Sequence, residues 1–256
     1  MAASLSFTSF LNELADSARR VDGVVGLVAF GSTAARERAD EWSDHDFAWL
    51  TEPGFADQFR QDLTWLPHAE DIALSVVEHH GGVKVIYRNG HRLEFGLAEV
   101  QTYSTWAGAP AEVLVGGASV HAATATVVAR RPEGAVDAER EVKLMLTQLH
   151  SGVGRARRGE TLSGSGLVRG EAVSHFARAA AARLSPEAAG LDELDPRRRF
   201  DGAYPQLGKR LEETVRHDIE AAARALVALA EEVLSPGWPQ FPFEGVAAVR
   251  LTFGWN

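Results

Sequence analysis

The sequence predicts a two-part chain: an α/β (α+β) domain with a mixed β-sheet over residues 1–130, followed by an all-helical domain over residues 131–256. Two observations predict this division. Before about residue 130, short apolar runs alternate with helical segments and glycine-containing turns, as expected when strands and helices are interleaved. After it, apolar residues recur every three or four positions over long segments, which is the period of amphipathic helices.

The N-terminal part begins with a predicted helix over residues 6–20, where apolar side chains recur at helical spacing. An apolar run at 24–30 predicts the first strand. A short helix is expected at 33–38, a second strand at 46–50, a helix at 55–65 and a third strand at 72–77.

A β-hairpin is predicted over residues 83–97. Two alternating runs flank Asn89-Gly90, a dipeptide that favours a type I′ turn. In the second run, Leu93 shares one face with the other apolar side chains, whereas Arg92 and Glu94 point to the opposite face. Glu94 is therefore expected on the polar face of a strand.

The stretch 103–135 contains a short apolar run at 113–115, and a linker is expected near residues 130–134. The part of the chain that follows this linker is predicted to be helical. Helices are expected at 137–158 and 167–184, with the glycine- and serine-containing segment 159–166 between them. A further long helix is expected within 204–234. The proline- and aromatic-rich tail from residue 235 predicts an irregular segment that packs across the surface.

Composition restricts the function. The chain has no cysteine, which excludes disulfides, thiolate metal sites and cysteine nucleophiles. Its net charge of −9 argues against a broad nucleic-acid surface, which needs cations to neutralise phosphates, and suits a cationic small molecule better. No run reaches about 18 apolar residues, and the N-terminus resembles no secretion signal, so we expect a cytoplasmic protein without a membrane partner.

The most informative stretch runs from residue 27 to residue 50. An apolar run breaks at Gly31-Ser32, and Asp44 and Asp46 follow on what we expect to be one face of a strand. At ~4 Å, two such carboxylates repel by roughly 4 kcal/mol at an effective dielectric constant near 20. Water, a basic partner, a shared proton or a divalent cation can relieve that repulsion. Backbone N–H groups near Gly31-Ser32 suit a phosphate, and phosphate beside paired carboxylates favours Mg²⁺.

This order of features resembles the nucleotidyltransferase superfamily that includes the DNA polymerase β-like enzymes. The family pattern is an apolar strand, Gly-Ser, an Asp-x-Asp strand and an acid on a later strand, and the resemblance covers about residues 24–98. It implies transfer of a nucleoside monophosphate from ATP or another NTP to a hydroxyl group. The predicted nucleotide-binding residues are Gly31, Ser32 and Thr33, and the predicted catalytic and Mg²⁺-binding residues are Asp44, Asp46 and Glu94.

A second resemblance concerns the helical part. Residues 157–160 (Arg-Arg-Gly-Glu) and 195–201 (Asp-Pro-Arg-Arg-Arg-Phe-Asp), with Pro205, resemble the C-terminal domains of lincosamide and aminoglycoside adenylyltransferases. This resemblance implies a small-molecule hydroxyl acceptor and antibiotic resistance. It favours Glu94 as the general base, with ligation of a second Mg²⁺ as the other role.

Two other functions stay open: a protein-modifying nucleotidyltransferase of the toxin–antitoxin type and a non-enzymatic nucleotide-binding module. Among nearby residues, His45 is expected to pack on the opposite face from the two aspartates, and Glu99 is out of phase with Glu94. Arg36 and Arg38 fit either the triphosphate or a solvated helix. Three tryptophans are candidates for base stacking, and the sequence selects none of them: Trp42, Trp65 and Trp106. The acceptor, the preferred NTP and the oligomeric state are not determined.

Overall fold

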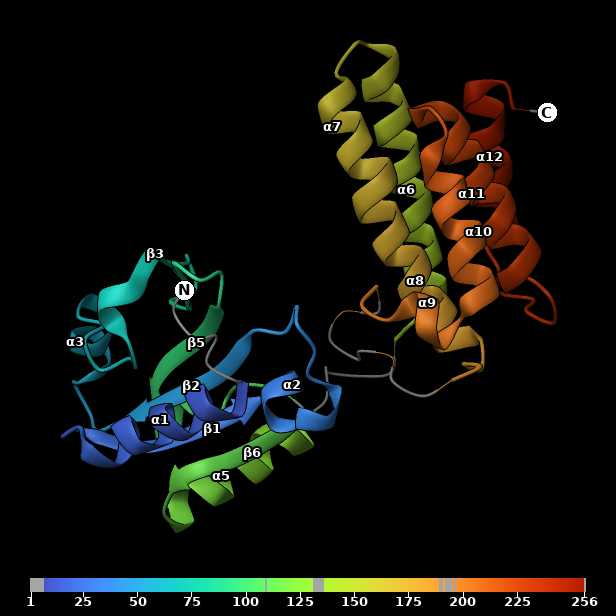
Figure 1. Cartoon of the computed structure of the whole chain (residues 1–256). Coiled ribbons are helices and arrows are strands. Elements are labelled where there is room, and N and C mark those ends of the chain that lie inside the picture. Colours follow the sequence, from blue (N-terminus) through green and yellow to red (C-terminus); the bar gives the residue numbers. More distant parts are fainter. Residues whose placement is uncertain are drawn as a thin grey trace. The chain divides into compact units, whose positions relative to one another are not determined.

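The computed structural model describes residues 7–108, 110–130, 136–188, 191, 195 and 197–255. The chain divides into two compact units, Met1–Pro132 and Glu133–Asn256, and each is described here by itself (Figure 1). The predicted domain boundary stays a prediction, because all but the first residue of the predicted linker lies outside the described residues. Within the described ranges, no helix is both long and apolar enough to cross a membrane.

The N-terminal unit contains a six-stranded mixed sheet in the order β3-β4-β5-β2-β1-β6. Its central pair, β2 and β5, is parallel, and all other neighbouring strands are antiparallel. The predicted mixed sheet followed by a helical part is therefore confirmed. The strands are β1 (Val24–Phe30), β2 (His45–Thr51), β3 (Ile72–Val77), β4 (Val83–Tyr87), β5 (Arg92–Glu99) and β6 (Ala111–Gly116).

Helices cover the two faces of this sheet unequally. On the first face, α1 (Phe7–Arg20) and α3 (Ala56–Gln61) pack on a core that includes Leu27, Phe47 and Phe95. On the second face, α4 (Val100–Tyr103) and α5 (Ala118–Ala129) pack on a core that includes Val28, Ala48 and Leu50. Toward β4 and β3 the second face carries exposed side chains, which leaves that part of the sheet open.

Two predicted helices of this unit differ in the structure. The expected helix at 33–38 is instead a single turn, α2 (Gly31–Ala34), followed by a 3₁₀ turn, η1 (Arg36–Arg38). The expected helix at 55–65 ends at Gln61. The carboxylate of Asp62 accepts the N–H of Thr64 at 2.9 Å, so the side chain closes a local turn that competes with helix continuation. A further 3₁₀ turn, η2 (Ala69–Asp71), precedes β3.

The hairpin is present, but its turn is not type I′. A type I′ turn needs positive φ at both central residues, whereas here Gly90 has φ +87° and Asn89 does not have positive φ. The carbonyl of Tyr87 accepts the N–H of Gly90, and the Asn89 side chain accepts the N–H of His91, both at 2.9 Å. The loop is thus a three-residue connection with glycine in the left-handed region.

Helix α5 lies in the stretch where the sequence indicated no helix. Its buried residues, Val120, Ala123, Thr124 and Val127, follow helical spacing. The Thr124 hydroxyl donates to the carbonyl of Val120 at 2.8 Å, which satisfies that buried group inside the helix. The signal was present, but small alanine and threonine side chains made the apolar face hard to distinguish.

In the helical unit, α6 (Ala138–Arg157) begins at Asp137, whose carboxylate accepts the N–H of Arg140 at 3.1 Å. The predicted separator 159–166 is wrong from Thr161 onward. Helices α7 (Thr161–Ser165), a π-helical turn η3 (Gly166–Glu171) and α8 (Ala172–Arg183) follow one another directly. A Cβ on Gly164 would lie 2.7 Å from the carbonyl oxygen of Gly152, so this glycine permits close helix packing rather than a loop.

The C-terminal helices are α9 (Phe200–Ala203), α10 (Pro205–Arg216), α11 (Ile219–Leu234) and α12 (Phe243–Phe253). The single long helix expected within 204–234 is divided at Asp218, whose carboxylate caps α11 by accepting the N–H of Ala221 at 3.0 Å. The predicted tail is irregular over residues 235–242, but it does not stay at the surface. Trp238 and Phe241 are buried in the helical core, and α12 follows them.

Candidate active site

The three predicted acids meet where β2 and β5 lie side by side in the sheet (Figure 1). Asp46 is directly opposite Glu94 in the parallel β2–β5 ladder, so the two side chains share one face. Asp44 precedes β2 by one residue, instead of lying within the strand as predicted. One carboxylate oxygen from each of the three residues lies within 4.8 Å of the other two. The sheet register therefore brings together acids that are far apart in the sequence.

The acid cluster (Asp44, Asp46 and Glu94) is accessible from solvent. Asp44 and Asp46 are half-buried, and Glu94 is exposed. Carboxylate oxygens are the ligands that Mg²⁺ prefers. The geometry thus offers a hard divalent cation three oxygen donors at the open face of the sheet.

In the part of the chain that the structure describes, Arg92 and Lys84 flank this cluster. A guanidinium nitrogen of Arg92 lies 3.5 Å from a carboxylate oxygen of Asp44. The Nζ atom of Lys84 lies 3.5 Å from Glu94 and 3.0 Å from Glu78. The hydrogen bond that Lys84 donates to Glu78 and the charge of Glu94 raise the pKa of Lys84 above its usual value. These cations partly offset the mutual repulsion of the carboxylates.

The Gly31-Ser32 break lies against the cluster. Gly31 has φ +55°, and a Cβ at this position would lie 3.2 Å from Oδ2 of Asp46. Its N–H already donates to the carbonyl of Pro110 at 3.1 Å. Gly31 therefore lets the backbone approach Asp46, while the N–H groups available for a phosphate would belong to Ser32 and Thr33 in the first turn of α2.

Thr33 holds the two aspartates in place. Its side chain is fully buried. Its hydroxyl oxygen accepts the N–H of Asp46 at 2.8 Å and donates to the carbonyl of Asp44 at 3.4 Å. The hydroxyl is thus engaged within the protein, and only the backbone of Thr33 stays available for the predicted nucleotide contact.

Between the two aspartates, His45 points to the other face of the sheet, as predicted. It is fully buried and stacks on the ring of Phe7, with ring centroids 3.8 Å apart. Its Nε2 donates to the Phe7 carbonyl at 2.9 Å, because a carbonyl can only accept. Its Nδ1 therefore accepts from Nε2 of His91 at 2.7 Å.

Burial has a clear electrostatic consequence for this histidine pair. Desolvation lowers the pKa of His45 to about 4. Desolvation also lowers the pKa of His91, although the charge of Asp44 opposes that shift. Both rings are therefore neutral near pH 7. The sequence did not indicate His91 as a partner, because the contact depends on the hairpin folding back toward β2.

The other candidates lie in different surroundings. Glu99 is at the opposite end of β5, where its carboxylate accepts the N–H of Gly54 at 3.3 Å. Arg36 pairs with Glu112 at 2.9 Å. The Trp106 ring covers Gly96, where an added Cβ would lie 2.3 Å from a ring atom. Gly96 is two residues beyond Glu94 on the same face, so the Trp106 ring lies on the sheet face that carries Glu94. The carbonyl of Trp42 accepts a hydrogen bond from Arg92 at 3.1 Å, and Arg92 pairs with Asp44.

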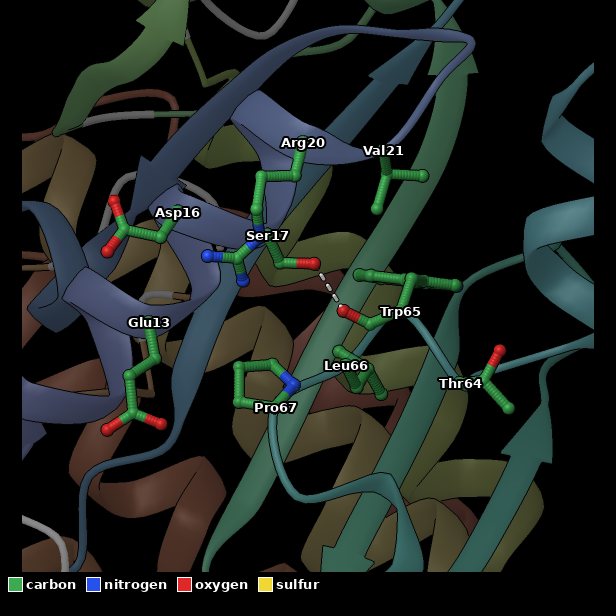
Figure 2. A pocket seen from close by; sticks show the side chains of 9 residues that line it. All are labelled: Glu13, Asp16, Ser17, Arg20, Val21, Thr64, Trp65, Leu66 and Pro67. Atoms are coloured by element: carbon green, nitrogen blue, oxygen red, sulfur yellow. Dashed lines mark hydrogen bonds between the residues drawn. The ribbon is translucent and has the colours of Figure 1, made fainter.

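A separate surface pocket lies between α1 and the segment 64–67 (Figure 2). Its volume is about 330 Å³, and the Ser17 hydroxyl donates to the Trp65 carbonyl at 2.5 Å within it. Glu13, Asp16 and Arg20 surround it. Helix α1 packs on the sheet face of Phe47, opposite to the face of Asp46, so this pocket does not contain the acid cluster.

No protein-family model and no curated protein sequence matches this chain. Among solved structures, it is similar to a nucleotidyltransferase-like protein from Exiguobacterium sibiricum, with 17% sequence identity and a TM-score of 0.36; the match covers 88% of this chain and 74% of that one. It is also similar to an aminoglycoside 6-adenyltransferase from Bacillus subtilis, with 10% identity and a TM-score of 0.31; that match covers 98% of this chain and 92% of the other. At these identities and TM-scores, neither likeness carries a conclusion about function.

Proposed function

We propose that this chain is a Mg²⁺-dependent nucleotidyltransferase that moves AMP from ATP to a hydroxyl of a small molecule and releases pyrophosphate. The observation that carries the proposal is the acid cluster, in which three carboxylates from β2, β5 and the residue before β2 converge within 4.8 Å beside a glycine turn. Lys84 and Arg92 lie beside two of these carboxylates, at 3.5 Å from Glu94 and from Asp44.

The donor set fits a hard divalent cation: three carboxylates, without the sulfur or imidazole ligands that favour zinc or copper. When bound, such a cation supplies neutralisation of the charge that develops on phosphate oxygens. Asp44 and Asp46 would hold it, and Thr33 fixes the backbone of both residues. Gly31 leaves room beside Asp46 that any larger side chain would fill.

Glu94 is proposed as the general base. It is the most exposed of the three acids. In this role its carboxylate accepts the proton of the acceptor hydroxyl, the hydroxyl oxygen bonds to the α-phosphorus, and the bond from that phosphorus to the pyrophosphate oxygen breaks. Its carboxylate lies 3.5 Å from the Nζ atom of Lys84, which places a positive charge beside the proposed base.

Aminoglycoside and lincosamide antibiotics are the proposed acceptor class. Aminoglycosides are cationic, and the net charge of −9 favours the approach of a cation to this chain. The resemblance of residues 157–160 and 195–201 to antibiotic adenylyltransferases is the second support. Among these residues, Arg157 pairs with Glu220 at 2.6 Å, so its charge is already engaged within the helical unit.

The test is pyrophosphate release from ATP and Mg²⁺ with a panel of aminoglycosides and lincosamides, using Asp46→Asn as the inactive blank. We expect release that depends on both Mg²⁺ and one acceptor, with the adenylylated product visible by mass spectrometry. Turnover with no member of the panel would remove the antibiotic acceptors. Transfer of label from ATP to proteins of a lysate would then favour the protein-modifying alternative. A wild-type chain that binds neither ATP nor Mg²⁺ would contradict the nucleotidyltransferase reaction.

A further inference from the structure

The open face of the sheet continues beyond Glu94, on the side away from Asp46. The strand order places β4 and then β3 next to β5 on this side. Two rows of side chains share the face of Glu94: Glu94, Lys84 and Val76 form one row, and Arg92, Ile86 and Leu74 form the other. The surface next to the acid cluster is therefore built by β4 and β3.

Three aliphatic side chains of these two rows are exposed. Leu74 and Val76 keep 54% and 51% of their surface exposed, and Ile86 keeps 38%. Because neighbouring strands are about 5 Å apart, β3 lies ~10 Å from Glu94 across the sheet. We call these three residues the aliphatic strip (Leu74, Val76 and Ile86). The strip and the acid cluster belong to one continuous face.

The geometry of the proposed reaction indicates which substrate meets this side. Gly31 directly follows β1 and lies beside Asp46, and the N–H groups of Ser32 and Thr33 come next in the chain. In the proposed reaction these groups bind the phosphates that leave as pyrophosphate. The attacking and leaving oxygens lie roughly in line at the phosphorus atom. The acceptor hydroxyl therefore approaches from the side opposite to β1, where β5 adjoins β4.

We propose that the aliphatic strip binds the apolar part of the acceptor, while the reacting hydroxyl of the same molecule lies at Glu94. This inference rests on the proposed function and names the chemistry of its acceptor. The acceptor carries an alkyl-bearing part at ~10 Å from the hydroxyl, which is the distance from β5 to β3. Burial of the strip and of that alkyl part then favours binding.

The charges of the two rows disfavour a polyamine on this path. Beyond Glu94 the charged members of the rows are Lys84 and Arg92. Lys84 lies 3.5 Å from Glu94 and 3.0 Å from Glu78, and Arg92 lies 3.5 Å from Asp44. A polyamine would bring like charges beside both cations before it reached the strip.

This chemistry distinguishes the two antibiotic classes. Lincosamides combine a hydroxylated sugar with an alkyl-substituted ring and one amine, whereas aminoglycosides carry several amines and little apolar surface. The aliphatic strip therefore favours an acceptor of the lincosamide kind.

The test is a calorimetric titration of lincomycin, and separately of kanamycin, into the chain with Mg²⁺ and α,β-methylene-ATP, an analogue that does not release pyrophosphate. We expect lincomycin to bind about tenfold more tightly than kanamycin. Leu74→Ala should weaken lincomycin binding about tenfold, as loss of an apolar contact does. The same variant should leave the affinity for the nucleotide analogue unchanged, because the strip lies on the acceptor side.

Val77→Ala is the matched control. Val77 is on the same strand and keeps 49% of its surface exposed, but it is one residue out of phase with Val76 and so points to the opposite face. Its substitution should leave lincomycin binding unchanged. Leu74→Met keeps an apolar side chain and should bind lincomycin like the wild type. A melting curve for each variant checks that the fold is retained.

Three results would overturn the proposal: lincomycin that binds no more tightly than kanamycin, a Leu74→Ala variant that binds lincomycin as Val77→Ala does, or a Leu74→Ala variant that loses lincomycin and nucleotide affinity equally. Pyrophosphate release from ATP tests the proposed function separately. Lincomycin that binds through Leu74 without any release would contradict nucleotidyl transfer and support the strip. Release with kanamycin that Leu74→Ala does not change would support nucleotidyl transfer and overturn the strip.

Discussion

At the start of β2, ionisable groups on the two faces of the sheet lie in opposite environments. On the open face, Asp46 and Glu94 are opposite each other and reach solvent together with Asp44. On the other face, His45 is completely buried against α1 and paired with His91. Consecutive residues of one strand thus carry a charged cluster and a neutral ring pair. The difference shows that helix coverage of a sheet face, rather than the position along the strand, decides whether a polar side chain of this sheet reaches solvent or packs in the core.

The largest effect is expected on the open face. Asp46→Asn keeps the shape of the side chain but removes one charge from the cation-binding oxygens. We expect pyrophosphate release to fall by about 10³-fold, since charge stabilisation of this kind is a large part of phosphoryl-transfer catalysis. Binding of Mn²⁺, followed by electron paramagnetic resonance, should weaken in parallel. Unchanged activity together with unchanged Mn²⁺ binding would show that the cluster is not the reaction centre.

Substitution of the two glutamates at opposite ends of β5 should have different effects on kcat. Glu94→Gln should lower kcat by about 10²–10³-fold, as expected for loss of a general base. Glu99→Gln is the matched control, because Glu99 lies at the other end of β5 beside Gly54, and it should leave kcat nearly unchanged. If Glu94→Gln weakens Mn²⁺ binding as strongly as Asp46→Asn does, the metal-ligand role is favoured over the base role.

The free energy of unfolding should depend on pH because of His45 on the buried face of the sheet. The pKa of His45 is about 4 in the folded chain and near 6.5 when exposed. Between these values only the unfolded chain binds the proton, so stability is complete above pH 6.5 and is lost as pH falls toward 4. From pH 7 to pH 5 the loss due to His45 is about 2 kcal/mol.

Thermal or urea unfolding as a function of pH measures this loss. His45→Gln should flatten the pH dependence between pH 5 and pH 7, while His121→Gln, an exposed histidine on α5, should leave it as in the wild type. An equally steep dependence in the His45→Gln variant would show that His45 does not cause the loss.

The smallest effect is expected from the cation beside Glu94. Lys84→Met removes an ion pair that is nearly half exposed, so we expect only a few-fold loss of activity. Lys84→Arg should restore the wild-type activity, because it restores the positive charge beside Glu94. A lysine with a purely structural role would change the melting temperature without changing kcat, and Lys84→Arg measured alongside Lys84→Met distinguishes the two outcomes.

Much of the sheet could be predicted because strand residues alternate. The alternation in β5 separated Leu93 from Glu94 correctly, and the apolar runs located β1 and β3. Where side chains bond locally with their own backbone, the prediction failed: Asp62 ends α3, Asn89 shapes the hairpin turn, and Asp218 divides a helix that looked continuous. Such bonds involve only two or three residues, so they leave little trace in an apolar pattern.

Glycines were misread for a related reason. Gly164 was interpreted as part of a loop, yet it lies inside continuous helical structure against Gly152. The requirement for a missing side chain there comes from a neighbouring helix. Similarly, the buried positions of Trp238 and Phe241 depend on the helices around them and not on the prolines beside them in the sequence.

By itself the sequence determined the residue types of the candidate site, the face of Glu94 and the packing role of His45, because the phase of a strand is a local property of the chain. Only the tertiary structure decided that β2 lies parallel to β5 and that Asp46 is therefore opposite Glu94. It also decided that Thr33, Lys84 and Arg92 lie beside the acid cluster, and that His91 pairs with His45 on the other face. Strand pairing joins segments distant in sequence, and its register is fixed by burial of the whole apolar face rather than by any one segment.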